Sequence, residues 1–158
     1  MLSKDSKNIN IKIDNPEKLK ITIVVSEWHS EITNKLFKGA KNVLTDNGLL
    51  EENINRVDVP GSFELIYGCR MVQKTYDQDA VIAIGCIVKG ETPHFDFISN
   101  AVSIGIKDLN ILYQTPVIFC VLTDNNIAQS LERSGGKYGN KGEDSALTAL
   151  KLISTIGK

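Results

Sequence analysis

Features that define several common classes of protein are missing from this chain. It has only three cysteines, Cys69, Cys86 and Cys120, and their odd number and wide spacing fit neither a disulfide framework nor a zinc site. No apolar run approaches the roughly 20 residues that span a bilayer. The formal net charge is −1, the pI is near 6.1 and no basic stripe is present. These absences argue against nucleic acid or a membrane as a partner, and they predict buried, free thiols.

Local signatures of other α/β proteins are absent as well. The first expected strand is followed by Ser26-Glu27-Trp28-His29, which is neither the G-x-G-x-x-G of a dinucleotide-binding domain nor a hydroxyl-rich flavodoxin loop. The third strand ends in Cys86-Ile87-Val88, without the clustered acids of a response-regulator receiver. The N-terminal segment MLSKDSKNIN has no apolar core of a secretory signal, so we expect a cytoplasmic protein.

The chain does contain a regular alternation of strands and helices. The expected strands are residues 19–25, 56–59, 80–88 and 117–122, and the helices lie near 32–47, 62–72, 92–109, 125–133 and 141–156. Such an alternation predicts parallel βαβ units with right-handed crossovers. We therefore expect a three-layer α/β/α sandwich of flavodoxin type with a four-stranded parallel sheet, formed by one domain over residues 19–158. Residues 1–18 are polar apart from a short isoleucine alternation, and they form either a disordered tail or an arm that adds a strand to a neighbour's sheet.

Short polar residues mark the expected helix starts. Ser62 and Thr92 each precede an apolar periodic segment and are predicted N-caps, and Asn125 or Asn126 opens the helix that runs to Arg133. Gly48 is the predicted stop of the first helix.

Ligands of such sheets bind beyond the carboxyl ends of the strands, so the segments that follow the strands should meet at one rim. After the third strand, Gly90-Glu91-Thr92 offers backbone N–H groups at a helix start, where a phosphate could be held; an ordinary capped turn is the alternative. His94 comes next, and its imidazole can take and give a proton near neutral pH, unless it only contacts solvent.

Four other side chains at this rim each have two interpretations. Trp28, the single tryptophan, can stack on a planar heterocycle or pack against the top of the core. Glu64 can accept hydrogen bonds from polyol hydroxyls or ring N–H groups, or it can complement a helix dipole. Arg133 can bind phosphate, or it can simply be a favourable positive charge at a helix C-terminus. Lys141, in Asn140-Lys141-Gly142, has the same ambiguity.

Taken in order, these segments resemble the lumazine synthase family of riboflavin biosynthesis. The match runs from about Leu19 to the C-terminus and consists of Trp28 with Ile32-Thr33, Val59 to Leu65, Gly85-Cys86, the GETPHFD block from Gly90 to Asp96, Pro116 to Thr123, Glu132-Arg133 and Asn140 to Gly142. The GETPHFD block is highly specific, whereas the others would be weak singly. Two departures are His29, where the family usually has asparagine, and Lys89, where arginine is common.

The resemblance implies the condensation of 5-amino-6-(D-ribitylamino)uracil with 3,4-dihydroxy-2-butanone 4-phosphate, which gives 6,7-dimethyl-8-ribityllumazine, phosphate and water. No metal and no organic cofactor is implied. His94 matches the proton donor, and the backbone at Glu91 and Thr92, with Arg133, matches the site of the butanone phosphate. The uracil and its ribityl chain would contact Trp28, Ser62, Phe63, Glu64, Cys86, Ile87, Val88, Phe119 and Lys141.

The family resemblance also implies an oligomer, because residues matching Phe119 and Arg133 come from the adjacent subunit. The family forms homopentamers with active sites at the subunit interfaces, and some members assemble twelve pentamers into an icosahedral shell. The compact connection from Gly135 to Gly142 resembles the shell-forming members. Riboflavin synthase is a candidate partner that such a shell would enclose. Two competing hypotheses are a non-catalytic flavin or lumazine binder and a homologue selected mainly for assembly.

Overall fold

The computed structural model describes residues 11 and 13–156 of the chain. Most of the predicted N-terminal arm, residues 1–18, lies outside the described residues. The strands are β1 (Ile21–Ser26), β2 (Ile54–Val59), β3 (Ala80–Val88), β4 (Val117–Asp124), β5 (Ser134–Gly136) and β6 (Gly139–Asn140). The helices are α1 (Ser30–Asp46), α2 (Leu65–Thr75), α3 (His94–Leu112), α4 (Ile127–Arg133) and α5 (Lys141–Ile156), with short 3₁₀ turns at Pro16–Lys18 and Glu51–Asn53.

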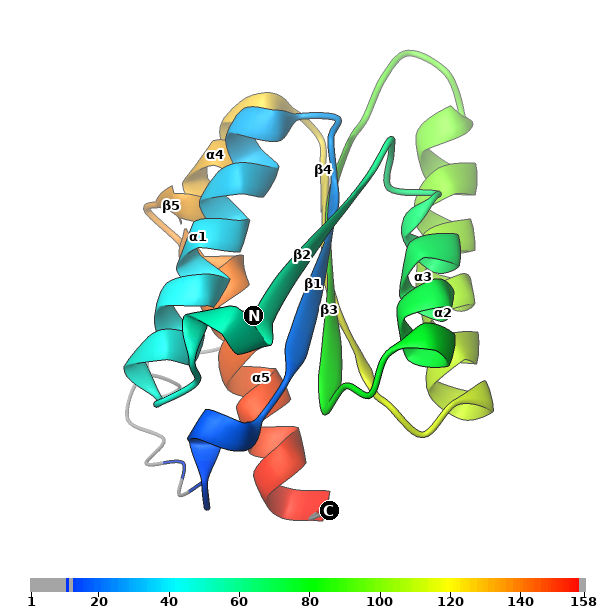
Figure 1. Ribbon diagram of the computed structural model, residues 1–158. Helices are drawn as coiled ribbons and strands as arrows, with labels where there is room; N and C mark the ends of the chain where they lie inside the picture. Colours follow the sequence, from blue (N-terminus) through cyan, green and yellow to red (C-terminus); the bar gives the residue numbers. More distant parts are fainter. Residues whose placement is uncertain (1–10, 12, 157–158) are drawn as a thin grey trace.

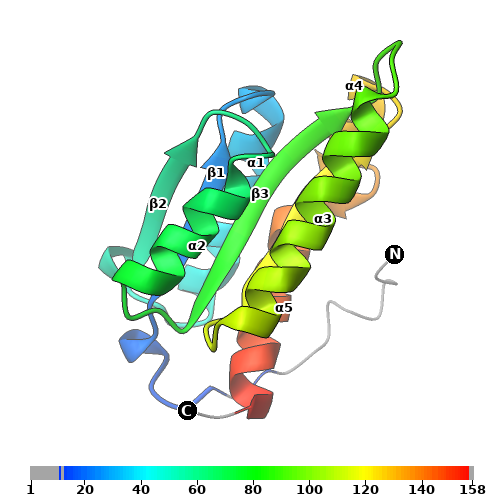
Figure 2. The ribbon, with the colours of Figure 1, turned by 90° about the vertical axis from the view of Figure 1, so that its right-hand side faces the viewer.

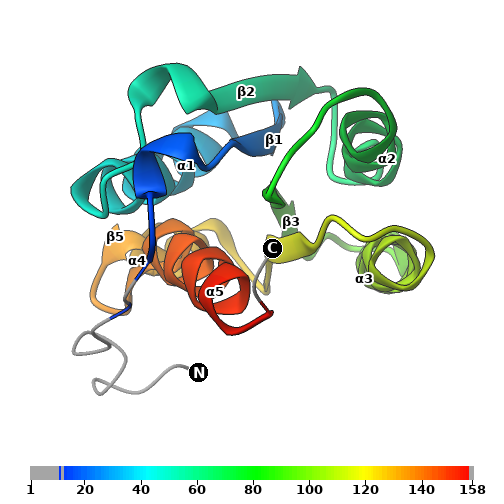
Figure 3. The ribbon, with the colours of Figure 1, turned by 60° about the horizontal axis from the view of Figure 1, so that its bottom comes forward.

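The main sheet has four parallel strands in the order β2-β1-β3-β4. Helices α1, α4 and α5 cover one face, and α2 and α3 cover the other (Figure 1). Viewed from the end of the sheet, α1 and α5 lie side by side, opposite the α2 and α3 layer (Figure 3). The predicted three-layer α/β/α sandwich with a four-stranded parallel sheet is therefore confirmed.

Alternate residues of the two central strands feed two separate cores. On β1, Ile23 and Val25 pack against α1 and α5, whereas Val24 packs toward α2 and α3. On β3, Ile82 and Ile84 belong to the core beneath α1 and α5, and Ala83 belongs to the core beneath α2 and α3. Because both faces of these strands are buried, their sequences are continuously apolar, as expected for central parallel strands.

The outer strands have a different composition because, among the described residues, each pairs with another strand on one side only. Arg56 and Asp58 form an exposed ion pair on β2, with 2.7 Å between Nη2 and Oδ1. Such charges are typical of protected sheet edges. On β4, by contrast, Phe119 is 43% exposed. The edge strand β4 thus carries an exposed aromatic side chain.

All four strands end at the same rim, where the site was expected. The register pairs Ser26 with Val59, and Val88 with Asp124. The loop between β3 and α3 extends beyond the sheet at this rim (Figure 2). Backbone bonds link the loops, since Glu27 N donates to Val59 O at 2.8 Å and Lys89 N to Asp124 O at 2.9 Å.

Two predicted helix caps were wrong, and one was confirmed. Helix α2 begins at Leu65 without a side-chain cap, and the Ser62 hydroxyl instead donates to Cys86 O at 3.5 Å. Helix α3 begins at His94, with Pro93 in the cap position and no side-chain cap, so Thr92 does not cap it. Asn126 does cap α4, because its Oδ1 accepts from Gln129 N at 3.0 Å.

Candidate active site

A cavity of about 450 Å³ lies at the rim, between the β1–α1 loop, the β2–α2 turn, the end of β3 and the start of α3. Nine of the predicted site residues line it: Trp28, Ser62, Phe63, Glu64, Cys86, Ile87, Val88, Thr92 and His94. His29, Gly90, Phe95 and Ile98 complete the lining. Segments that are far apart in the sequence therefore meet as the strand-end rule predicted.

The backbone around Trp28 presents its indole to this cavity. The next residue, His29, has φ of 58°, a left-handed conformation that histidine adopts more readily than most residues, and it turns the chain into α1. Trp28 N donates to Pro60 O at 3.3 Å, and the side chain is 67% exposed. The tryptophan therefore does not pack into the core, and one of its two interpretations is excluded.

Gly61 allows Trp28 and Glu64 to lie close together. A Cβ on Gly61 would come within 2.9 Å of Glu64 Oε2 and 3.3 Å of Trp28 Cε3. The absence of a side chain thus lets an aromatic ring and a carboxylate share the turn between β2 and α2. Such a pair suits a ligand with a flat ring and a hydroxylated substituent.

Close packing of the β2–α2 turn on β3 sets the floor of the cavity. A Cβ on Gly85 would lie 2.7 Å from Ser62 Oγ and 2.9 Å from Leu65 Cδ1. Ser62 is only 4% exposed, and its bond to the Cys86 carbonyl crosses from the turn to the strand. The tertiary contact with β3 explains why this serine does not cap α2.

The start of α3 forms the opposite wall. His94 is its first residue and is exposed to solvent. The first N–H groups of a helix lack intrahelical partners and favour an anion. The loop that leads into α3 is open at Gly90, since a Cβ at this position would meet no atom within 4 Å. Glu91 is exposed but does not line the cavity.

Three predicted site residues lie elsewhere in the same chain. Phe119, Arg133 and Lys141 line a second cavity of about 770 Å³, which follows β4 and the first turns of α5. No residue belongs to both cavities. Within one chain, Arg133 and His94 therefore line different cavities.

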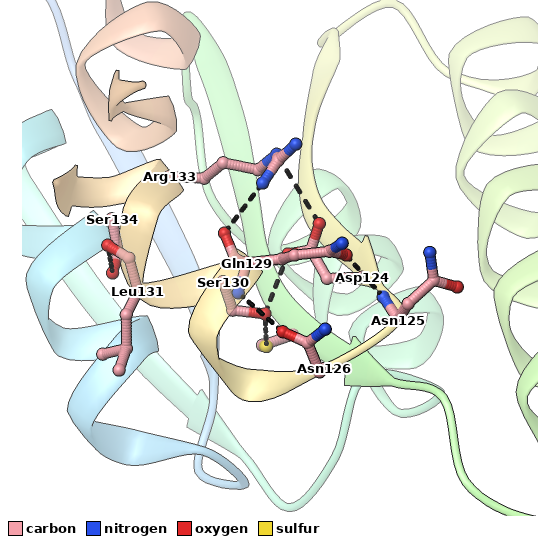
Figure 4. Close-up of polar contacts among 9 residues, drawn as sticks. Asp124, Asn125, Asn126, Gln129, Ser130, Leu131, Arg133 and Ser134 are labelled. Atoms are coloured by element: carbon pink, nitrogen blue, oxygen red, sulfur yellow. Dashed lines mark hydrogen bonds and ion pairs between the residues drawn. The ribbon is translucent and has the colours of Figure 1, made fainter. Parts of the chain in front are cut away.

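Arg133 ends α4 and is held by several contacts (Figure 4). Its Nη1 donates to Gln129 O at 2.9 Å, its Nε lies 3.6 Å from Asp124 Oδ1, and its Cζ is 4.9 Å from the centroid of the Tyr138 ring. Asp124 and Ser130 were not predicted as functional residues. Their buried pairing appears only in three dimensions, although an acid at the end of a strand was a usable signal.

The three cysteines are free and buried, as predicted. Burial raises the pKa of both the Cys69 and the Cys120 thiol to about 12, and it also raises the pKa of Cys86. These thiols are therefore protonated near neutral pH and are poor nucleophiles. Within residues 11 and 13–156, no cluster of three or more potential metal ligands occurs, and no helix is long and apolar enough to cross a membrane.

The fold and the cavity define an α/β protein with a small-molecule site at the carboxyl ends of a parallel sheet. A family model described as 6,7-dimethyl-8-ribityllumazine synthase matches residues 18–156. Curated proteins of that name are similar to this chain. The one from Christiangramia forsetii is 55% identical over 141 residues, which cover 89% of this chain and 84% of the relative. The one from Parabacteroides distasonis is 46% identical over 142 residues, which cover 90% of this chain and 89% of the relative.

The chain therefore belongs to the 6,7-dimethyl-8-ribityllumazine synthase family. It is an enzyme of the transferase kind. It catalyses the condensation of 5-amino-6-(D-ribitylamino)uracil with 3,4-dihydroxy-2-butanone 4-phosphate in riboflavin biosynthesis. The hypothesis of a non-catalytic binder is thereby set aside.

Proposed function

We propose that each active site is assembled from two copies of the chain. One copy supplies the cavity from Trp28 to His94, and its neighbour supplies the β4 edge with Phe119, Arg133 and Lys141. The separation of the predicted site residues into two cavities is the observation that supports this arrangement. A phosphate-bearing substrate needs both an anion partner and a proton donor, and in the proposed arrangement the second copy supplies the anion partner.

The uracil substrate is assigned to the first cavity. Trp28 stacks on the pyrimidine, and Glu64 accepts hydrogen bonds from the ribityl hydroxyls. Ser62, Phe63, Cys86, Ile87 and Val88 line the same cavity and shape the walls around the ligand. Phe119 and Lys141 of the neighbour close the pocket over it. The exposed indole and the position of Glu64 across Gly61 support this assignment.

The butanone phosphate is assigned to the start of α3. The backbone N–H groups at Glu91 and Thr92 and the guanidinium of the neighbour's Arg133 bind its phosphate. Holding both substrates in one pocket lowers the barrier, because the amine and the ketone are already a matched nucleophile and electrophile. Phosphate departs after imine formation, and the same cationic group stabilises its charge.

His94 is assigned the proton transfers. The amine attacks the ketone and water leaves to give an imine, and elimination of phosphate then gives an enol that tautomerises to a carbonyl. The ribityl-bearing nitrogen attacks this carbonyl, and loss of a second water completes the ring. Each of these steps moves a proton, and an imidazole can accept it in one step and return it in the next. Its position at the start of α3, beside the Gly90 loop, supports this role.

We propose a homopentamer as the assembly, in the cytoplasm. Three apolar residues seven positions apart on α3, Phe97, Ile104 and Ile111, are between 55% and 72% exposed, which marks a face that a partner covers. The outer edge of β4, which pairs with no strand among the described residues, is a second such surface. The compact β5–β6 hairpin supports further assembly of twelve pentamers into a shell, and three free thiols suit a reducing compartment.

Replacing His94 with alanine tests the catalytic assignment. We expect kcat to fall by roughly 10-fold, less than the usual contribution of general acid–base catalysis, because proximity of the substrates survives and solvent reaches this position. The KM values for both substrates should change little. The measurement follows the joint release of lumazine and phosphate.

The matched control for that variant is His29→Asn, since asparagine tolerates the left-handed backbone at this position and His29 is the only other histidine. Free imidazole should partly restore turnover to the His94 variant and not change the control. An unchanged kcat in His94→Ala would refute the proton-transfer role.

A further inference from the structure

Asp124, the last residue of β4, is a buried acid with partners on both carboxylate oxygens. It is 7% exposed. Oδ2 accepts a hydrogen bond from Ser130 Oγ at 2.8 Å, and Oδ1 lies 3.6 Å from Arg133 Nε (Figure 4). Ser130 is fully buried and in turn accepts from Cys86 Sγ at 3.5 Å. The serine thus fixes the carboxylate so that its other oxygen faces the arginine.

The contacts of Arg133 leave one side of its guanidinium available. Nε faces Asp124, and one hydrogen of Nη1 is used by the Gln129 carbonyl. The Tyr138 ring lies against the plane of the group. Nη2 has no hydrogen-bond partner within the part of the chain that the structure describes. The Nη1–Nη2 edge is the fork that binds two phosphate oxygens at once.

We propose that Asp124 is a positioning residue that orients Arg133 for the phosphate of the butanone substrate. The proposal rests on the phosphate-binding role assigned to Arg133 above. A long arginine side chain loses rotamer entropy when it binds an anion, and a side chain already held in place loses less. Asp124 touches neither substrate in this arrangement and acts through the guanidinium.

Asp124 also has an opposing effect, which makes the proposal easy to refute. Its negative charge near the guanidinium repels an approaching phosphate. If repulsion outweighs orientation, Asp124→Asn lowers the KM for the butanone phosphate. If orientation dominates, the same variant raises it. A purely structural ion pair predicts reduced stability with no selective change in either KM.

The test is Asp124→Asn in the full assembled enzyme, since asparagine keeps the shape and can still accept from Ser130. We expect the KM for the butanone phosphate to rise about 5-fold or more, with the KM for the uracil substrate unchanged. Inorganic phosphate, titrated by calorimetry, should bind correspondingly more weakly. Ser130→Ala should also raise the KM for the butanone phosphate and weaken the binding of inorganic phosphate, but by less. This variant replaces Asp124→Asn in the test if Asp124→Asn does not fold. Asp58→Asn, which breaks the exposed Arg56 pair, is the matched control.

A double-mutant cycle separates this proposal from the one on which it rests. In the Arg133→Ala background, Asp124→Asn should have no further effect on the KM for the butanone phosphate. If Arg133→Ala alone leaves that KM unchanged, the role of Arg133 itself is wrong. If Arg133→Ala raises it but Asp124→Asn lowers it or leaves it unchanged, only the positioning role of Asp124 is overturned.

Discussion

Replacing Arg133 with alanine is expected to raise the KM for the butanone phosphate roughly 10- to 100-fold, because a hydrogen-bonded charge contributes about 1.5–3 kcal/mol. The KM for the uracil substrate should change little, since that ligand is assigned to the cavity of Trp28 and Glu64. Steady-state kinetics with each substrate varied in turn measures both values.

Arg133→Lys is the informative control for that result. Lysine keeps the charge but lacks the planar fork, so it should recover only part of the affinity for the phosphate substrate. Equal KM values for this substrate in the wild type and the alanine variant would refute the assignment of Arg133.

Replacing Gly142 with alanine is expected to destabilise the fold by about 3 kcal/mol, at the upper end of what overpacking costs. Gly142 is buried in the first turn of α5, where α5 packs on α1. A Cβ there would overlap the carbonyl oxygen of Leu36 and come within 2.6 Å of its carbonyl carbon. These are backbone atoms that cannot rotate aside, so the two helices would have to separate.

Urea unfolding at equal protein concentration measures this change, because the proposed assembly would contribute to apparent stability. Gly105→Ala is the matched control. The three atoms nearest to the Cβ it adds all belong to the side chain of Ile66, with 2.5 Å to Cδ1, and this side chain can rotate away. Gly105→Ala should therefore lower the free energy of unfolding clearly less than Gly142→Ala does. A loss in Gly142→Ala no greater than in Gly105→Ala would contradict the packing described for α1 and α5.

The sequence was most informative where hydrophobic burial alone decides the structure. Residues 80–88 were predicted as a strand with the bounds of β3, because the run is apolar on both faces and polar residues flank it. Strand β4 extends two residues beyond its predicted end, to Asp124. Thr123 and Asp124 look like loop residues, but they pair with Ile87 and Val88 of the neighbouring strand.

Local rules failed where tertiary contacts compete with them. Serine is typical of helix caps, but the Ser62 hydroxyl donates its hydrogen bond to the Cys86 carbonyl on β3. Helix-cap propensities take only neighbouring residues into account, and this hydrogen bond joins residues 24 positions apart. Local rules also did not predict that Asp124, at the end of β4, contacts Ser130 and Arg133 of helix α4.

The residues that line the candidate cavity were largely predictable from the sequence, and the family resemblance already assigned Phe119 and Arg133 to an adjacent subunit. The strand-end rule brought Trp28, Glu64 and His94 together, as the structure bears out. Sequence order alone placed Arg133 at the same rim. In the structure β4 lies at the sheet edge, and Arg133 lines a separate cavity along it.

Activity in mixed assemblies tests most directly the claim that two copies build each site. One chain would carry His94→Ala with Glu64→Gln, and the other Arg133→Ala; each assembly alone should be weakly active. After the two chains are unfolded and refolded together, about a quarter of the interfaces combine an intact cavity with an intact Arg133. We therefore expect activity near a quarter of the wild-type value, and none of this gain when preformed assemblies are mixed without exchange. Activity that stays at the mean of the two variants after co-refolding would contradict the two-copy site.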